Sequence, residues 1–247
     1  LKENVATDLP EKIEQVVPCD LTPTQREVYD KLLRESRESV LDAEGGRRRM
    51  LALTALLRLR QTCCDLRLLG MEGIDPDDAS IKGAALEELL ANAIDGGHRV
   101  LVFSQFVEML QLLVPVLAEQ GRSFCYLDGS TRNRGDVVKR FQEDDSIPVF
   151  LISLKAGGTG LNLTGADTVI HVDPWWNPAV EAQATDRAHR IGQKRTVNSY
   201  KLIARATVEE KILSLQAKKK EIADSLLLGG AAEEASLTDD ELVALFE

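Results

Sequence analysis

Apolar residues from position 81 onward follow two alternating rhythms. Short, nearly continuous apolar runs occur at VLVFS (100–104), FCYLD (124–128), VFLIS (149–153), TVIHVD (168–173) and NSYKLI (198–203). The stretches between them carry apolar residues at helical spacing, over 81–94, 106–121, 135–144 and 178–190. Continuous apolar runs that alternate with helices are typical of a parallel sheet buried on both sides. We therefore predict an α/β fold, a parallel sheet with helices on both faces.

The segments on either side of this region have a different pattern. IEQVV has strand character, and Leu21-Thr22-Pro23 has the composition of a helix start, an N-cap followed by proline. Helices are expected over 23–40 and 47–64, followed by a polar, turn-rich loop. After the last strand we expect a helix over 207–226 and a short acidic amphipathic helix over 237–246.

Composition excludes several classes of protein. No apolar run reaches the roughly 18–20 residues that a membrane helix needs, and LKENVATDLP has no apolar signal region, so we expect neither a membrane span nor a signal peptide. The four cysteines form no CxxC pair and only three histidines are present, which argues against a zinc site or a disulfide framework. A reducing compartment fits this cysteine usage.

The charge is unevenly distributed. The net charge is −10, but residues 231–247 contain six acids and no base, whereas residues 187–220 contain ten Lys and Arg against two acids. Nucleic acid responds to the local field rather than to the sum over the chain. The basic stretch is therefore either a solvated helix face or a surface that meets phosphates.

The carboxyl ends of the predicted strands carry small, hydroxyl and glycine residues. These ends are 104–105, 128–131, 153–160 and 173–178, and in an open parallel sheet such ends form one ligand-binding edge. Each alone could be an ordinary N-cap or turn, but four together describe an edge suited to successive phosphates. The loop AGGTG is not GxGxxG, because Leu163 occupies the third glycine position, and no GxxxxGKS or GxxxxGKT occurs in these 247 residues.

The string QATDRAHRIGQ (183–193) places charged side chains close together. On a helix over 178–190, Gln183, Arg187 and Arg190 would share one face, and two adjacent guanidinium groups repel each other unless an anion lies between them. A triphosphate fits that requirement. The alternative is that these arginines form salt bridges with Asp186 or Glu181. His189 is expected to pack or hydrogen bond rather than act as a base.

Trp175-Trp176 is unusual in a chain with 4% aromatic residues. Two prolines flank the pair at the end of a strand. Either both rings are buried, or one packs while the other touches a nucleotide or a groove.

Taken together, these strings resemble a known family. LDGST, SLKAGGTGLNLTGADTVIHVDPWWNP and QATDRAHRIGQKRTVNSYKLI resemble the second-lobe motifs of Swi/Snf-type ATPases, which are superfamily 2 helicase-like translocases of double-stranded DNA. LPEKIEQVVPCDLTPTQREVY, LRLRQTC, RVLVFSQF and VEEKILSLQAKKKEIADSLL are similar to the flanking segments of that lobe. The resemblance covers nearly the whole chain.

The resemblance implies two RecA-like lobes with ATP in the cleft between them. An N-terminal RecA-like lobe would hold most of the ATP and its Mg²⁺, and no metal ligand is expected in this chain. Arg187 and Arg190 would be arginine fingers, Gln183 would couple the lobes, and Gly158 would lie near the nucleotide. The residues implied to grip the DNA backbone are Ser104, Gln105, Thr131, Lys155, Thr159 and Gly160. Trp176 would touch the duplex groove.

The resemblance also suggests how the chain is divided. Residues 1–20 would be a lead-in segment, 21–80 a helical protrusion with an exposed loop, 81–206 the RecA-like lobe, 207–230 a bracing helix, and 231–247 an acidic tail with a short helix. Two positions depart from the family pattern. Lys155 stands where many members have arginine, and CDLRL (64–68) replaces a more usual Asn-His-Pro string.

The sequence therefore predicts the C-terminal motor lobe of an ATP-dependent DNA translocase or remodeller. The isolated chain is expected to be a monomer without ATPase activity, since it lacks the phosphate-binding loop. Its expected partners are double-stranded DNA and the N-terminal lobe, in the bacterial cytoplasm with the nucleoid, or in the nucleus if the source is eukaryotic. The alternative is a non-catalytic module derived from such a lobe that binds DNA or a partner.

Overall fold

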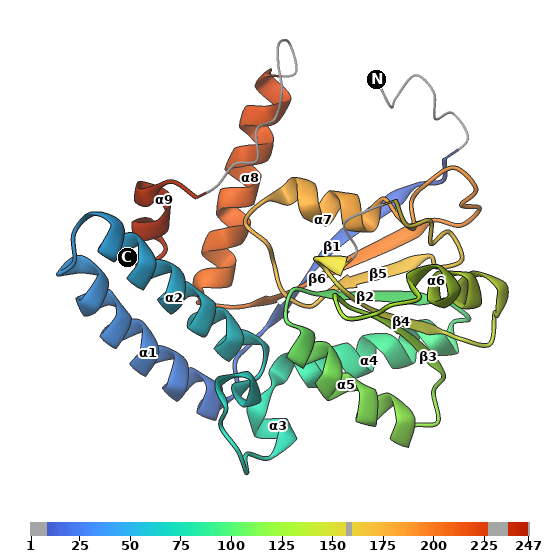
Figure 1. Ribbon diagram of the computed structural model, residues 1–247, viewed down its shortest axis with the longest axis horizontal. Coiled ribbons are helices and arrows are strands. Elements are labelled where there is room, and N and C mark those ends of the chain that lie inside the picture. The colour runs from blue at the N-terminus through green and yellow to red at the C-terminus, as the bar shows by residue number, and fades with distance from the viewer. Residues whose placement is uncertain (1–8, 157–159, 227–236, 247) are drawn as a thin grey trace. The chain divides into compact units, whose positions relative to one another are not determined.

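The computed structural model describes residues 9–156, 160–226 and 237–246 (Figure 1). It contains a six-stranded sheet in the order β1-β6-β5-β2-β4-β3. The strands are β1 (Lys12–Cys19), β2 (Val100–Ser104), β3 (Phe124–Leu127), β4 (Val149–Ser153), β5 (Thr168–His171) and β6 (Val197–Ala204). Each predicted apolar run forms a strand at its predicted place.

All neighbouring strands run parallel. β2 pairs in parallel with β4 and β5, β3 with β4, and β5 with β6. The Val197 amide donates to the Glu11 carbonyl and, eight residues later on both strands, the Arg205 amide donates to the Cys19 carbonyl, so β1 also runs parallel to β6. The predicted parallel sheet is confirmed.

Burial along the strands follows from their position in the sheet. Every residue of β2, β4 and β5 is buried, whereas the edge strands β1 and β3 have partly exposed positions. A strand covered by helices on both faces needs apolar residues throughout, which is why these central strands have unbroken apolar runs.

Helices cover both faces of the sheet (Figure 1). Their bounds are α1 (Pro23–Leu41), α2 (Gly45–Cys64), α3 (Pro76–Ala79), α4 (Ile81–Asp95), α5 (Val107–Glu119), α6 (Arg134–Glu143), α7 (Pro178–Thr185), α8 (Val208–Leu226) and α9 (Asp239–Ala244). A short 3₁₀ helix spans Leu66–Leu69. α4 and α5 lie on one face and α7 on the other, as right-handed crossovers require when the chain moves in opposite directions along the sheet.

The helix expected over 178–190 is shorter than predicted. α7 ends at Thr185, and the chain continues in tight turns, with the Arg187 amide donating to the Ala184 carbonyl and the Ala188 amide to the Thr185 carbonyl. Gly192, at φ +105°, cannot continue a helix. The prediction that Gln183, Arg187 and Arg190 share one helix face was therefore wrong.

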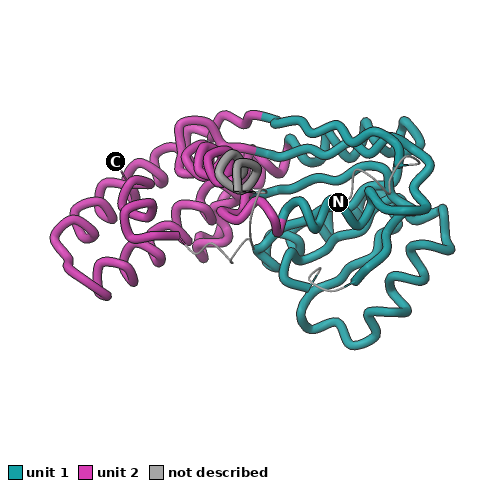
Figure 2. Tube along the Cα trace, turned by 90° about the horizontal axis from the view of Figure 1, so that it is seen from above, with its two compact units in different colours: residues 1–17, 85–173, 181–202 teal, residues 18–84, 174–180, 203–247 magenta. Residues whose placement is uncertain are grey.

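The chain forms two compact units that interleave along the sequence (Figure 2). The first contains residues 1–17, 85–173 and 181–202, and the second contains 18–84, 174–180 and 203–247. The five-segment division suggested by the resemblance stays a prediction.

The second unit has its own apolar core. Tyr29 of α1, Leu56 and Leu59 of α2, and Ile212 of α8 are buried in one cluster with Leu242 of α9. Two capping boxes fix helix starts, Thr22 with Gln25 at α1 and Thr238 with Glu241 at α9. The acidic C-terminal helix is thus part of this core.

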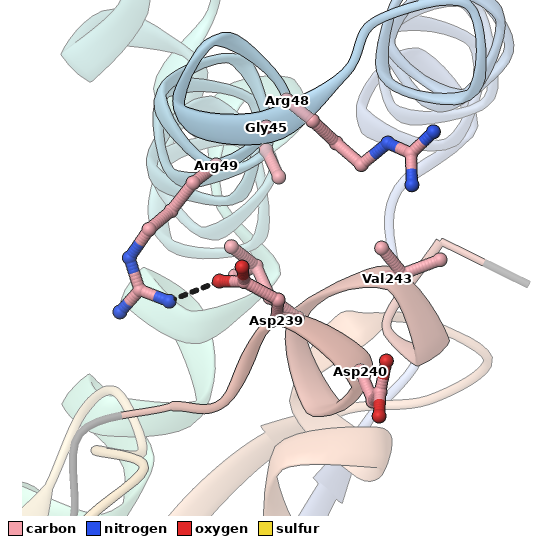
Figure 3. Close-up of a pocket in the computed structure, with 8 residues that line it drawn as sticks. Gly45, Arg48, Arg49, Asp239, Asp240 and Val243 are labelled. Carbon is pink, nitrogen blue, oxygen red and sulfur yellow. Dashed lines mark hydrogen bonds and ion pairs between the residues drawn. The ribbon is translucent and has the colours of Figure 1, made fainter.

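A shallow pocket of about 90 Å³ lies between α2 and α9 (Figure 3). Its lining residues are Gly45, Arg48, Arg49, Ala52, Asp239, Asp240, Leu242 and Val243. Arg49 forms an ion pair with Asp239 across the pocket. The pocket lies wholly within the second unit, whereas the residues predicted to meet nucleotide lie in the first.

Cys19, Cys63, Cys64 and Cys125 are all buried free thiols. Among the described helices, none is long and apolar enough to cross a membrane. Within the same residues, no cluster of three or more His, Cys, Asp or Glu could hold a metal ion.

Candidate functional site

The carboxyl ends of the central strands are tied together by one carboxylate. Asp173 accepts a hydrogen bond from the Ser104 hydroxyl (2.5 Å) and one from the Gln105 amide (3.2 Å). Ser104 is the register partner of Ser153, and its carbonyl accepts from the Leu154 amide at 2.8 Å. The loops that follow β2, β4 and β5 therefore form one connected edge.

The loop after β3 is a compact turn around Asp128. The Ser130 amide and hydroxyl donate to the Asp128 carboxylate at 2.8 and 2.7 Å, and the Asp128 amide donates to the Thr131 hydroxyl at 3.0 Å. The Ser130 hydrogen bonds, opposed by desolvation, lower the pKa of Asp128. This turn holds Thr131, half-buried, at the same edge of the sheet.

Arg187 is the most unusual residue of the first unit. Its side chain is buried at 6% exposure, and its Nε and Nη1 atoms have no hydrogen-bond partner in the part of the chain that the structure describes. Burial alone lowers the pKa of Arg187. Glu181, one of the proposed salt-bridge partners, instead pairs with Lys201 at 2.7 Å. Burying a guanidinium is costly unless it is paired, so this position is suited to an anion.

Neighbouring residues fix the backbone around Arg187. His171, stacked on Phe103, hydrogen bonds through Nε2 to the Thr185 hydroxyl (2.9 Å) at the end of α7. Burial lowers the pKa of His171 to about 4, so its ring is neutral. The Leu163 amide donates to the Arg187 carbonyl at 3.0 Å. These contacts place Arg187 through its backbone, while its Nε and Nη1 atoms find no partner among the residues that the structure describes.

Gln193 closes the turn that follows. Its Nε2 donates to the carbonyls of Ala166 (2.7 Å) and Ala188 (3.1 Å), and its Oε1 accepts from the Lys194 and Arg195 amides. His189 contacts the Pro10 carbonyl at 2.7 Å, which confirms its expected hydrogen-bonding role. The string that the sequence singled out is thus mainly a rigid support for Arg187.

The other predicted residues differ in accessibility. Lys155, Gly160, Gln183 and Arg190 are exposed, and Gln105 is half-buried. Ser104 is buried at 1%, and its hydroxyl also accepts from the Phe106 amide, so it is fully engaged within the protein. Gly158 and Thr159 lie outside the described residues. Arg190 and Arg187 therefore do not form a matched pair, because only Arg187 is buried.

Trp175 and Trp176 belong to the second unit and stack on each other. Their ring centroids lie 3.7 Å apart, and both residues are half-buried. Trp176 packs against the apolar core of the second unit. Neither residue is fully buried, so the pair keeps an accessible surface.

Sequence reasoning missed three supporting residues, Asp173, His171 and Gln193. Asp173, His171 and the Nε2 of Gln193 each bond to a residue at least 14 positions away, which no local spacing reveals. A polar residue directly after or within an apolar strand was the available signal for Asp173 and His171.

Comparisons with known proteins agree with this arrangement. Residues 81–192 match the helicase conserved C-terminal domain, and residues 1–68 match the SNF2-related domain. An ATP-dependent helicase of Mycoplasma pneumoniae, described as uncharacterized, is 38% identical over 248 residues, which cover 100% of this chain and 24% of the relative. The chain spans about a quarter of the length of the bacterial relatives it matches.

Two solved structures from Sulfolobus solfataricus are similar over nearly the whole chain. Its SWI2/SNF2 ATPase core in complex with double-stranded DNA is 34% identical, covers 91% of this chain and 48% of that one, and has a TM-score of 0.76. Its isolated SWI2/SNF2 ATPase C-terminal domain is 30% identical, covers 95% of this chain and 94% of that one, and has a TM-score of 0.74. The chain therefore belongs to the helicase-like SWI2/SNF2 ATPase family and has the fold of its C-terminal RecA-like lobe.

Proposed function

We propose that this chain is the second motor lobe of an ATP-dependent translocase of double-stranded DNA, and that Arg187 meets the phosphates of ATP held by a first lobe. The observation that carries the proposal is the buried guanidinium of Arg187, whose Nε and Nη1 lack partners among the described residues. ATP would supply the anion that this position lacks, and with it the phosphoryl group to be transferred.

Arg187 has the properties of a group that acts late in a reaction. Its backbone is fixed by Leu163, so little ordering is needed when charge develops on the transferred phosphoryl group. Its low exposure strengthens any electrostatic interaction it makes. Arg190 and Gln183 are exposed. We therefore assign Arg190 as a second arginine finger and Gln183 as a residue that couples the lobes, and both would engage the first lobe or its nucleotide when the lobes close.

The DNA contacts we propose lie along the carboxyl edge of the sheet. Lys155 and Gly160 are exposed there, with Gln105 and Thr131 half-buried, and Ser104 acts by holding the Gln105 loop through Asp173. Gly160, at φ +63°, has a conformation that favours glycine and leaves the backbone accessible to a phosphate. Backbone contacts of this kind carry no base specificity. The related Sulfolobus solfataricus core was solved with double-stranded DNA, which supports the same ligand here.

The experiment compares the 247-residue chain with the longer protein that contains a nucleotide-binding lobe. ATP turnover is measured for both, with and without duplex DNA. We expect DNA-stimulated turnover only when both lobes are present, and a DNA affinity of the isolated chain that falls steeply with salt. Turnover by the isolated chain would overturn the half-site assignment. Absence of turnover in the longer protein would favour a non-catalytic module that binds DNA or a partner.

A further inference from the structure

Arg60 lies on the buried face of α2, where an arginine is unexpected. The neighbouring buried positions are Ala52, Leu56, Leu59 and Cys63, all small or apolar. Arg60 is nevertheless exposed by only 2% and is the largest of the fully or nearly fully buried side chains. An arginine at such a position is costly to bury, so its specific contacts must compensate.

Three of those contacts reach the double-tryptophan segment. The Arg60 Nη2 atom donates to the Pro174 carbonyl at 2.5 Å. The guanidinium carbon lies 5.3 Å from the Trp175 ring centroid and 5.7 Å from that of Trp176. A single cation therefore contacts the backbone before the pair and both of its rings, within distances typical of cation–π interactions.

A second helix holds the same segment. Gln216 of α8, buried at 4%, donates from Nε2 to the Trp175 carbonyl. The rings stack with their planes inclined by 27°. Residues from α2 and α8 thus bind two consecutive carbonyls, those of Pro174 and Trp175, and so fix the backbone that carries the two rings.

We propose that Arg60 is a positioning residue for the DNA contact of the motor, because it sets the orientation in which Trp176 is presented. The inference rests on the proposed function, in which Trp176 meets the duplex. Gln216 adds a link from the same segment to α8. A movement of α2 relative to α8 would therefore change the presentation of Trp176.

The planar fork of arginine explains why this residue type is needed. A guanidinium can lie against both rings while its N–H donates to a carbonyl, and a lysine ammonium, a strongly hydrated point charge, does not reproduce both contacts. Arg60→Lys keeps the charge and loses this combination, and Arg60→Met keeps approximate length and loses both. Arg58, exposed on the same helix with a 3.3 Å hydrogen bond to Gln61, offers the matched control Arg58→Lys.

The first measurement uses the 247-residue chain, since a domain of this extent was solved in isolation for the Sulfolobus solfataricus relative. Trp175 and Trp176 are its only tryptophans, so tryptophan fluorescence and the exciton couplet in circular dichroism report on this pair alone. We expect most of the couplet to be lost in Arg60→Lys and Arg60→Met and kept in Arg58→Lys, at temperatures where thermal melting shows each variant folded. An unchanged couplet in a folded Arg60→Lys would overturn the positioning role.

The second measurement uses the longer protein and determines the DNA concentration that gives half-maximal stimulation of its ATPase activity. We expect Arg60→Lys to raise it about tenfold, Trp176→Phe to raise it similarly, and Arg58→Lys to leave it unchanged. If Trp176→Phe has no effect, the proposed DNA role of Trp176 fails, whereas the couplet still decides whether Arg60 positions the rings. If only Trp176→Phe has an effect and the couplet survives in Arg60→Lys, the positioning role of Arg60 is overturned.

Discussion

Two buried cations in this chain have opposite surroundings. Lys82, in the second unit, is fully buried and pairs with Glu209 at 2.6 Å. Burial by itself would lower the pKa of Lys82, but the Glu209 carboxylate together with the nearby Cys63 and Cys64 raises it above its usual value. Arg187, in the first unit, is buried nearly as well, and no carboxylate of the described residues pairs with it, so burial lowers its pKa.

The difference separates a structural charge from a functional one. The Lys82 ammonium donates to Oε1 of Glu209 at 2.7 Å and lies 2.6 Å from Oε2, which also accepts from the Ala204 amide at 2.8 Å. In the proposed function, Arg187 is completed by the phosphates of ATP. Burial of a charge does not by itself indicate function, whereas burial without a partner does.

The largest effect is expected from Arg187→Ala in the longer protein. ATP turnover should fall by about 10³–10⁵, while nucleotide and DNA affinity change little, because the side chain acts on charge that develops during transfer. Arg187→Lys should not restore turnover. The assay measures kcat, nucleotide Kd and melting temperature on one preparation.

Arg195→Ala is the control, since Arg195 is exposed in the same segment and pairs with Asp167 at 3.1 Å. Its turnover should match that of the unaltered protein. A normal kcat with a lowered melting temperature in Arg187→Ala would place Arg187 with Lys82 as a structural cation.

The next largest effect is expected from Glu209→Gln, which leaves Lys82 without its carboxylate. The free energy of unfolding should fall by about 3–5 kcal/mol in urea titrations, and the double change with Lys82→Met should recover much of it. Glu143→Gln is the control, because the Lys139–Glu143 pair is exposed and 3.9 Å long. That change should alter stability by less than about 0.5 kcal/mol. A small loss in Glu209→Gln would mean that the buried pair does not stabilise the unit.

His171 tests a third way of burying a basic group, which is to lose its charge. Its pKa falls from 6.5 to about 4 on burial, so the unfolded chain binds more protons between these values. Its contribution to stability is fully present above pH 6.5 and is lost as the pH falls towards 4, by about 3 kcal/mol. Unfolding titrations across this range should show that slope, and His171→Gln should remove it. Equal slopes in both proteins would refute the assignment.

The smallest effect concerns stability at Arg187 itself. In the isolated chain, Arg187→Met should raise the free energy of unfolding by about 1 kcal/mol, because it removes a buried charge without a partner. Arg190→Met, at an exposed position, should change it by less than about 0.5 kcal/mol. Destabilisation by Arg187→Met would contradict the distinction drawn between Arg187 and Lys82.

The sheet could be predicted because its signal is local. VLVFS and VFLIS have apolar residues at consecutive positions, and only a strand buried on both faces needs that pattern. The family followed from strings such as DRAHRIGQ, and the comparisons confirm it.

The site could be predicted only in composition. Helical spacing placed Arg187 beside Arg190. In the structure, the Leu163 amide binds the Arg187 carbonyl and the Gln193 side chain binds the Ala188 carbonyl, and the helix ends before both. The isolation of the Arg187 guanidinium also depends on which carboxylates reach it, and Glu181 is already paired with Lys201. Such facts are tertiary, so spacing cannot supply them.

The parallel pairing of β1 with β6 has a mechanical consequence. β1 begins near the start of the chain, and β6 ends where the chain enters α8. Tension between the start of β1 and the end of β6 pulls the two strands along their length in opposite directions. The hydrogen bonds from Val197 to Glu11 and from Arg205 to Cys19 then share the load in shear and do not open one after another. A lobe loaded through these two strands can transmit force without unzipping its own sheet.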